Sequence, residues 1–171
     1  LHYSAIFQKA GLDLILPTAG LSELINLEII GDSSHGRLAQ SCLRSNITGK
    51  VCGECWKCFR KNSLRGEDAK ISDEVKTFLN KEPLKQAVST IYALQKISQK
   101  QPKLLAQFTH LEPLMSMDLG WLNRYHPDSP QFVPEEMRSL FIKKLNNVAL
   151  PMNDEERLRV ETLEIYAQNE E

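Results

Sequence analysis

Four cysteines stand within seventeen residues of each other, and the chain of 171 residues contains no further cysteine. Nine residues separate the first two and two residues separate each later pair: Cys42, Cys52, Cys55 and Cys58. A disulfide framework would spread its cysteines along the chain to join distant loops. Grouped cysteines with C-x2-C steps are instead typical of a metal site in a reducing compartment. We therefore expect these thiolates to share one metal ion, and we expect the protein in the cytoplasm.

Zinc is the ion that this ligand set favours. Zinc binds four thiolates tetrahedrally at about 2.3 Å, and four protein ligands leave no open position for water, so the predicted site is structural. Gly53 inside the first C-x2-C step and Gly49 before it permit the left-handed backbone of such a turn. An iron–sulfur cluster is the main alternative, although a ferredoxin run would continue after Cys58. Free buried cysteines and a redox dithiol are the others.

The segment around the cysteines is basic. Residues 37–65 carry seven lysines and arginines against Glu54 alone, whereas the net charge of the whole chain is −1. Trp56 and Phe59 stand among these cations. One interpretation is that the cations balance the net negative charge of a zinc tetrathiolate while Trp56 packs beneath the loop. The other is that residues 37–65 bind phosphate or nucleic acid, because interleaved basic and aromatic residues suit that role.

The rest of the chain predicts mainly helices. From Ser72 onward apolar residues recur with helical spacing, and cap or proline signals precede each run: Ser72, Pro83, Pro102, Pro113, Pro134, and Asn153 with Glu156. Residues 24–29 predict a helix capped by Ser22 or Thr18, and the apolar run from Leu12 to Leu16 predicts a short buried strand. The predicted fold class is mainly α. A small mixed α/β zinc-loop region at residues 1–68 precedes an all-helical extension at residues 69–171.

Several classes of function find no support in the sequence. No run of eighteen apolar residues occurs, so we expect neither a transmembrane helix nor a membrane partner. Serine-hydrolase, HExxH and glycine-rich phosphate-loop motifs are also missing. Catalytic residues therefore cannot be assigned from the sequence.

Three short segments together resemble a known enzyme family. They are Leu16-Pro17-x3-Leu21-Ser22-Glu23, then Ser41-Cys42, then Cys52-Gly53-Glu54-Cys55-Trp56-Lys57-Cys58-Phe59-Arg60. This pattern is similar to the C-terminal part of the PP-loop ATP pyrophosphatases that act as 7-cyano-7-deazaguanine synthase in queuosine biosynthesis. The resemblance covers roughly residues 12–62. It implies that the four cysteines hold a structural zinc, as they do in that family.

The resemblance also implies a partner. The family binds ATP through an S-G-G-x-D-S loop, and this chain has no such loop. We therefore expect the chain to be the zinc-bearing portion of an ATP-dependent C–N ligase, inactive alone, with ATP bound only when an N-terminal nucleotide half or a partner chain supplies the loop. Arg37, Arg44 and Arg60 would face ATP phosphates or the acid substrate. Residues 1–30 would expose apolar surface where the missing half docks.

Two other functions stay open at the level of sequence. The chain could be a zinc-knuckle module that contacts nucleic acid or protein through residues 37–65, with binding that weakens as salt rises. It could also be an interaction protein whose helical region does the work. The helical region from residue 69 onward matches no family that we can name.

Overall fold

The chain is mainly helical, as its sequence predicts. The structure is a computed structural model that describes residues 2–12, 15–39, 42, 44–47 and 50–163. Its α-helices are α1 (His2–Lys9), α2 (Glu23–Gly31), α3 (Trp56–Leu64), α4 (Asp73–Leu79), α5 (Ala87–Lys100), α6 (Pro102–Leu105), α7 (Glu135–Asn146) and α8 (Asp154–Glu161). Its 3-10 helices are η1 (Gly36–Leu38), η2 (Thr109–Ser116), η3 (Gly120–Asn123) and η4 (Ser129–Phe132), and its strands are β1 (Arg124–Tyr125) and β2 (Leu150–Pro151). Among the described helices, none combines the length and apolarity needed to cross a bilayer.

The chain divides into two compact units that do not follow the predicted boundary near residue 68. The first unit combines Leu1–Ile29 with Trp121–Glu161, and the second contains Ile30–Gly120 with the described residues from Thr162 onward. The predicted boundary near residue 68 lies inside the second unit, and the division into a zinc-loop region and a helical extension stays a prediction. The N-terminal segment of the chain packs with residues that follow the thiol region by more than sixty positions.

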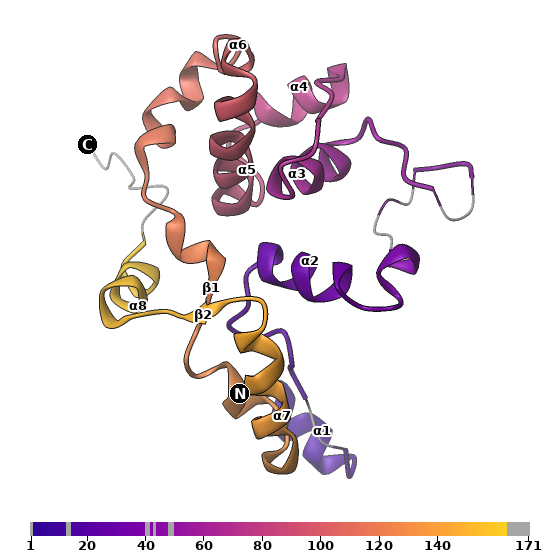
Figure 1. Cartoon of the computed structure of the whole chain (residues 1–171), viewed down its shortest axis with the longest axis vertical. Helices are drawn as coiled ribbons and strands as arrows, with labels where there is room; N and C mark the ends of the chain where they lie inside the picture. Colours follow the sequence, from indigo (N-terminus) through magenta and orange to yellow (C-terminus); the bar gives the residue numbers. More distant parts are fainter. Residues whose placement is uncertain (1, 13–14, 40–41, 43, 48–49, 164–171) are drawn as a thin grey trace. The chain divides into compact units, whose positions relative to one another are not determined.

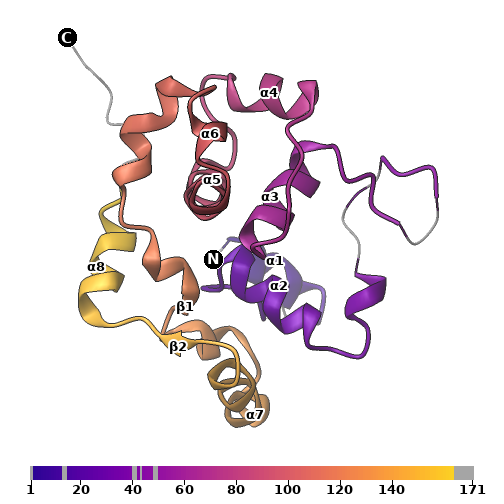
Figure 2. The same ribbon diagram turned by 45° about the horizontal axis from the view of Figure 1, so that its top comes forward.

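Long-range packing builds the first unit. Its core contains buried Ile25, Tyr125 and Leu145, against which partly buried apolar side chains of α2 and α7 pack. The two strands, far apart in sequence, pair in parallel with Tyr125 opposite Pro151. Figures 1 and 2 show β1 next to β2. The predicted cap on α2 is confirmed, because Ser22 Oγ accepts the Ile25 N–H at 3.1 Å.

The turn before α2 depends on Gly20. Its φ of +74° lies in the left-handed region, and a Cβ there would collide with Ser129 Oγ and lie 3.0 Å from His126 Cβ. The Gly20 carbonyl also accepts the His126 N–H at 2.9 Å. Glycine therefore lets this turn pack directly on residues 126–129.

Gly20→Ala should lower the free energy of unfolding of the first unit by about 2–4 kcal/mol, since backbone strain and the collision add. Denaturant unfolding followed by Trp121 fluorescence checks this. Gly11→Ala is the matched control, because Gly11 also belongs to the first unit and has a φ of +69°, but nothing lies within 4 Å of an added Cβ there. Equal stability of the two variants would contradict the role of Gly20.

The second unit is built on the contact between α3 and α5, which lie side by side in both views (Figures 1 and 2). Phe59 of α3 and Ile91, Leu94 and Ile97 of α5 are all inaccessible to solvent. The helix α4 begins at its predicted cap, where Ser72 Oγ accepts the Val75 N–H at 3.2 Å. The result is a helical core that begins directly after the last cysteine.

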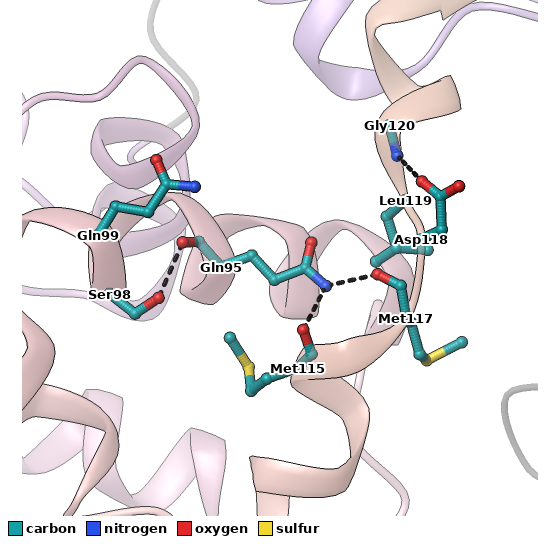
Figure 3. Close-up of a pocket in the computed structure, with 8 residues that line it drawn as sticks. All are labelled: Gln95, Ser98, Gln99, Met115, Met117, Asp118, Leu119 and Gly120. Carbon is teal, nitrogen blue, oxygen red and sulfur yellow. Dashed lines mark hydrogen bonds between the residues drawn. The ribbon is translucent and has the colours of Figure 1, made fainter.

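Gln95 of α5 binds the C-terminal end of η2 and the residue that follows it. Its Nε2 donates to the carbonyls of Met115 at 3.2 Å and Met117 at 2.8 Å, as Figure 3 shows. An open cavity of about 370 Å³ lies beside this clamp and is lined by Ser98, Gln99, Asp118 and their neighbours. These two hydrogen bonds tie the end of η2 to α5.

Other local predictions differ from the structure. Leu12, Ile15 and Leu16 are exposed and belong to no strand, so the buried strand predicted there is wrong for these residues; the rest of that run lies outside the described residues. The helix predicted from Pro83 begins at Ala87 instead. The capping box predicted for α8 is confirmed, since the Asn153 N–H donates to Glu156 Oε2 and the Glu156 N–H to Asn153 Oδ1, each at 2.9 Å.

Candidate metal centre

The structure brings the four predicted cysteines together in the second unit. Their Sγ atoms all lie within 4.8 Å of one another. Three of the six separations are 3.9 Å for Cys42–Cys55, 3.8 Å for Cys52–Cys58 and 3.5 Å for Cys55–Cys58. All are far longer than the roughly 2.05 Å of a disulfide bond, and the four cysteines are free. The cluster can therefore hold a metal ion.

These separations match four ligands around one small ion. Thiolates about 2.3 Å from a tetrahedral metal stand about 3.8 Å apart, because the edge of a tetrahedron is about 1.6 times its radius. An iron–sulfur cluster has several iron atoms, and cysteines bound to different irons would stand farther apart. The geometry of this site therefore favours a mononuclear centre.

The backbone around the cysteines turns toward the sulfurs. The Cys52 N–H donates to Cys42 Sγ and the Cys55 N–H to Cys52 Sγ, both at 3.4 Å. Gly53 has a φ of +76°, which confirms the left-handed position predicted inside the first C-x2-C step; Gly49 lies outside the described residues. Amide hydrogens aimed at sulfur stabilise the thiolate over the thiol.

The start of α3 supplies the two buried ligands. Cys55 is the N-cap of α3 and its carbonyl accepts the Phe59 N–H, while Cys58 lies in the first turn. Both are 4% exposed, whereas Cys42 and Cys52 are half-buried. The positive end of the helix dipole favours anions at this position. The start of α3 thus fixes the positions of Cys55 and Cys58, and the preceding loop brings the more exposed Cys42 and Cys52 next to them.

The metal-free thiols differ in acidity. Hydrogen bonds from the backbone N–H groups of Cys52 and Arg44 lower the pKa of Cys42 to about 6. Burial raises the pKa of Cys58 to about 12 and also raises the pKa of Cys55. The two thiols on α3 are therefore protonated at neutral pH until a cation displaces their protons.

Metal uptake should consequently weaken as the pH falls. Because the raised pKa values of Cys55 and Cys58 mean that binding releases protons, the apparent association constant for zinc should drop at least about tenfold per pH unit from about pH 8 to pH 6. A competition titration against a chromophoric chelator at several pH values measures this. An affinity independent of pH would show that these thiols do not bind the ion as thiolates.

Two contacts fasten the cysteine loop to α4. Arg44 forms an ion pair with Glu74, and Ser72 Oγ donates to the Glu54 carbonyl at 2.6 Å. Glu54 also pairs with Lys70 at 3.7 Å. Sequence reasoning identified Ser72 only as a helix cap and missed its link to the loop, since nothing local in the sequence signals a contact across eighteen residues.

The aromatic residues of the segment are occupied within the unit. Trp56 stacks on Phe78 with ring centroids 4.6 Å apart and an interplanar angle of 11°. The Arg60 guanidinium lies 4.9 Å from the centroid of the Trp56 ring, and Phe59 is fully buried. Neither ring is therefore available to stack on a nucleic-acid base. If this segment binds nucleic acid, the contacts come from its exposed lysines and arginines.

The three arginines predicted to bind ATP or an acid substrate differ in their exposure and in their partners. Arg60 is 4% exposed and packs against Trp56. Arg44 is largely exposed but paired with Glu74. The side chain of Arg37 lies outside the described part of the structure. Their role in phosphate binding stays a prediction.

Comparison with known proteins identifies the family. Neither the curated proteins nor the solved structures gave a significant match to the chain. A family model matches residues 2–164, so the segment with the cysteines and the helices on both sides of it form one family unit. The chain belongs to DUF6395, a family of unknown function.

Proposed function

We propose that Cys42, Cys52, Cys55 and Cys58 bind one structural zinc ion. The observation that carries this proposal is the grouping of four Sγ atoms within 4.8 Å of one another, with three of the six pairs 3.5–3.9 Å apart, which suits one tetrahedral ion. Thiolate-only tetrahedral sites select zinc or iron–sulfur, and the spacing argues against a cluster. Four protein ligands close the site, so the ion stabilises the second unit and does not bind substrate.

Metal analysis of the purified chain tests the ion. We expect about one zinc per chain and no visible absorption band, because zinc has a filled d shell. Iron accompanied by a broad absorption band would replace zinc with a cluster. A metal-free chain that does not take up added zinc would overturn the site itself.

We propose as a second step that the chain works as a zinc-stabilised portion of a PP-loop, 7-cyano-7-deazaguanine-synthase-like ligase. The support is the exposed apolar surface expected where a nucleotide-binding half would dock. Five large apolar side chains within residues 5–16 are 37–55% exposed: Ile6, Phe7, Leu12, Ile15 and Leu16. Exposed apolar residues so close together in sequence are typical of a segment that a partner covers.

Reconstitution tests this second step. The chain is mixed with the ATP-loop half of a 7-cyano-7-deazaguanine synthase, truncated before its own zinc segment, and pyrophosphate release from ATP is measured. We expect release only in the mixture and a loss of at least about tenfold with Phe7→Glu, since a carboxylate in an apolar interface is costly. Leu158→Glu, at an exposed leucine of α8, is the matched control. No complex and no release would overturn the ligase proposal and leave the zinc proposal intact.

A further inference from the structure

The first unit contains a small cavity that the metal site does not use. Its volume is about 210 Å³. The turn before α2, the 3-10 helix η3 and helix α8 line it, together with the residues that directly follow β1 and β2. Its lining is Gly20, Leu21, Ser22, Trp121, Leu122, His126, Met152 and Val160. All eight residues belong to the first unit. Cavities for drug-sized ligands measure about 300–1,000 Å³, so this one fits a molecule of about one ring.

The walls of this cavity are apolar. Five of its eight residues present apolar or aromatic side chains, and the hydroxyl of Ser22 is already committed: it donates to the Leu122 carbonyl at 2.6 Å and accepts the Ile25 N–H. Water held in a cavity needs two to four polar partners. The lining therefore favours an organic molecule over water.

His126 supplies the polar group of the cavity. Its Nδ1 accepts the Asp128 N–H at 3.2 Å, so the neutral ring carries its hydrogen on Nε2. The side chain is 23% exposed, and within the described residues Nε2 has no hydrogen-bond partner. A ligand thus meets an N–H donor, and an acceptor is the group that satisfies it.

Trp121 supplies an aromatic wall. Its indole Nε1 is buried and has no hydrogen-bond partner among the described residues, so this atom is closed to solvent and is not counted as a donor to a ligand. His126 Nε2 is therefore the donor on which the site depends. The Asp128 carboxylate near His126 is itself paired with Arg157 at 4.0 Å. None of the eight lining residues is a lysine, arginine, aspartate or glutamate, so a charged ligand would lose its hydration without gaining an ionic partner.

We propose that this cavity binds a small uncharged one-ring molecule with a hydrogen-bond acceptor, of the aryl ketone or aryl amide class. The ring packs between Trp121 and the aliphatic side chains, and the acceptor takes the N–H of His126 Nε2. This site is independent of the zinc proposal, since no cysteine contributes to it.

A matched pair of probes tests the site. Acetophenone carries an acceptor, and ethylbenzene has nearly the same shape without one. The chain contains two tryptophans, so the ¹⁵N spectrum shows two indole N–H signals, which Trp121→Phe assigns. We expect acetophenone to shift the Trp121 signal saturably while the Trp56 signal stays in place. We also expect acetophenone to bind about fivefold more tightly than ethylbenzene, the factor that one net hydrogen bond contributes.

Two variants locate the interaction. In His126→Asn the side-chain oxygen can still accept the Asp128 N–H, but the shorter amide places its NH2 group nearer the backbone and leaves no donor at the position of Nε2, so the preference for acetophenone should disappear. Val160→Phe fills the cavity and should abolish the shift for both probes. Equal affinity of the natural protein for the two probes, no saturable shift at Trp121, or a preference that survives His126→Asn would overturn the proposal. The comparison of the two probes needs no variant, so it decides even if a variant fails to fold.

Discussion

Cys58→Ser should remove the bound metal and lower the free energy of unfolding of the second unit by more than about 4 kcal/mol, the range in which loss of a structural metal falls. Serine is a poor zinc ligand, and the three remaining thiolates cannot close the site. Cys58 lies in the first turn of α3, next to the main contact between α3 and α5. Loss of the metal therefore releases the cysteine loop and also destabilises the start of a core helix. Zinc content and denaturant unfolding measure the two effects.

A chelator provides the control for this prediction. If the loss of stability comes from the metal, the natural protein in excess chelator should unfold at the same denaturant concentration as Cys58→Ser. Cys42→Ser is the matched variant, because Cys42 belongs to the loop and not to the helical core. It should lose zinc as completely as Cys58→Ser. Retention of one zinc per chain by either variant would contradict a site closed by four thiolates.

Phe59→Ala should lower the free energy of unfolding of the second unit by about 3–5 kcal/mol, as truncation of a fully buried phenylalanine does. Phe59 is inaccessible to solvent and packs where α3 meets α5. The cavity left behind cannot collapse easily, because the metal site fixes the start of α3 and the apolar side chains Ile91, Leu94 and Ile97 of α5 are already fully buried.

The two tryptophans make this measurement specific. Trp56 lies in the second unit and Trp121 in the first, so unfolding in a Trp121→Phe background reports the second unit alone. Phe132→Ala is the matched control, because Phe132 is 36% exposed and belongs to the first unit; it should leave the Trp56 transition unchanged. A cost below about 1.5 kcal/mol for Phe59→Ala would show that α3 and α5 pack less tightly than the structure indicates.

The thiol cluster and the helix caps could be predicted because they are local. A C-x2-C step brings two sulfurs together through one tight turn, and Ser22, Ser72 and Asn153 each bond to an amide three residues away. The partition of the chain could not be predicted, because it depends on Tyr125 pairing opposite Pro151 and on Ile25 packing against Leu145. No local pattern in the sequence encodes either contact.

Charge and apolar periodicity also proved ambiguous without tertiary contacts. Arg60 looks like any other cation of its basic segment, yet it lies buried against Trp56 because Phe78 of α4 completes the stack. Likewise, helical spacing places Met137, Leu140 and Leu145 on α7, but only Leu145 is buried. A pattern identifies which residues can be buried, and the neighbouring elements decide which of them are.

The first unit is made of two segments that are distant in sequence, and this affects the order in which the protein folds during synthesis. Its two segments are separated along the chain by the whole of Ile30–Gly120, so the residues up to Ile29 leave the ribosome long before their packing partners exist. Nearly all of the second unit has emerged once Gly120 leaves the ribosome, so this unit can fold first, as domains generally do during translation. A folded insert holds its own ends at a set separation, which reduces the chain-closure entropy that the outer segments must overcome to meet. Zinc supply during translation would then influence how quickly residues 121–161 find the N-terminal helices, although none of those residues touches the metal.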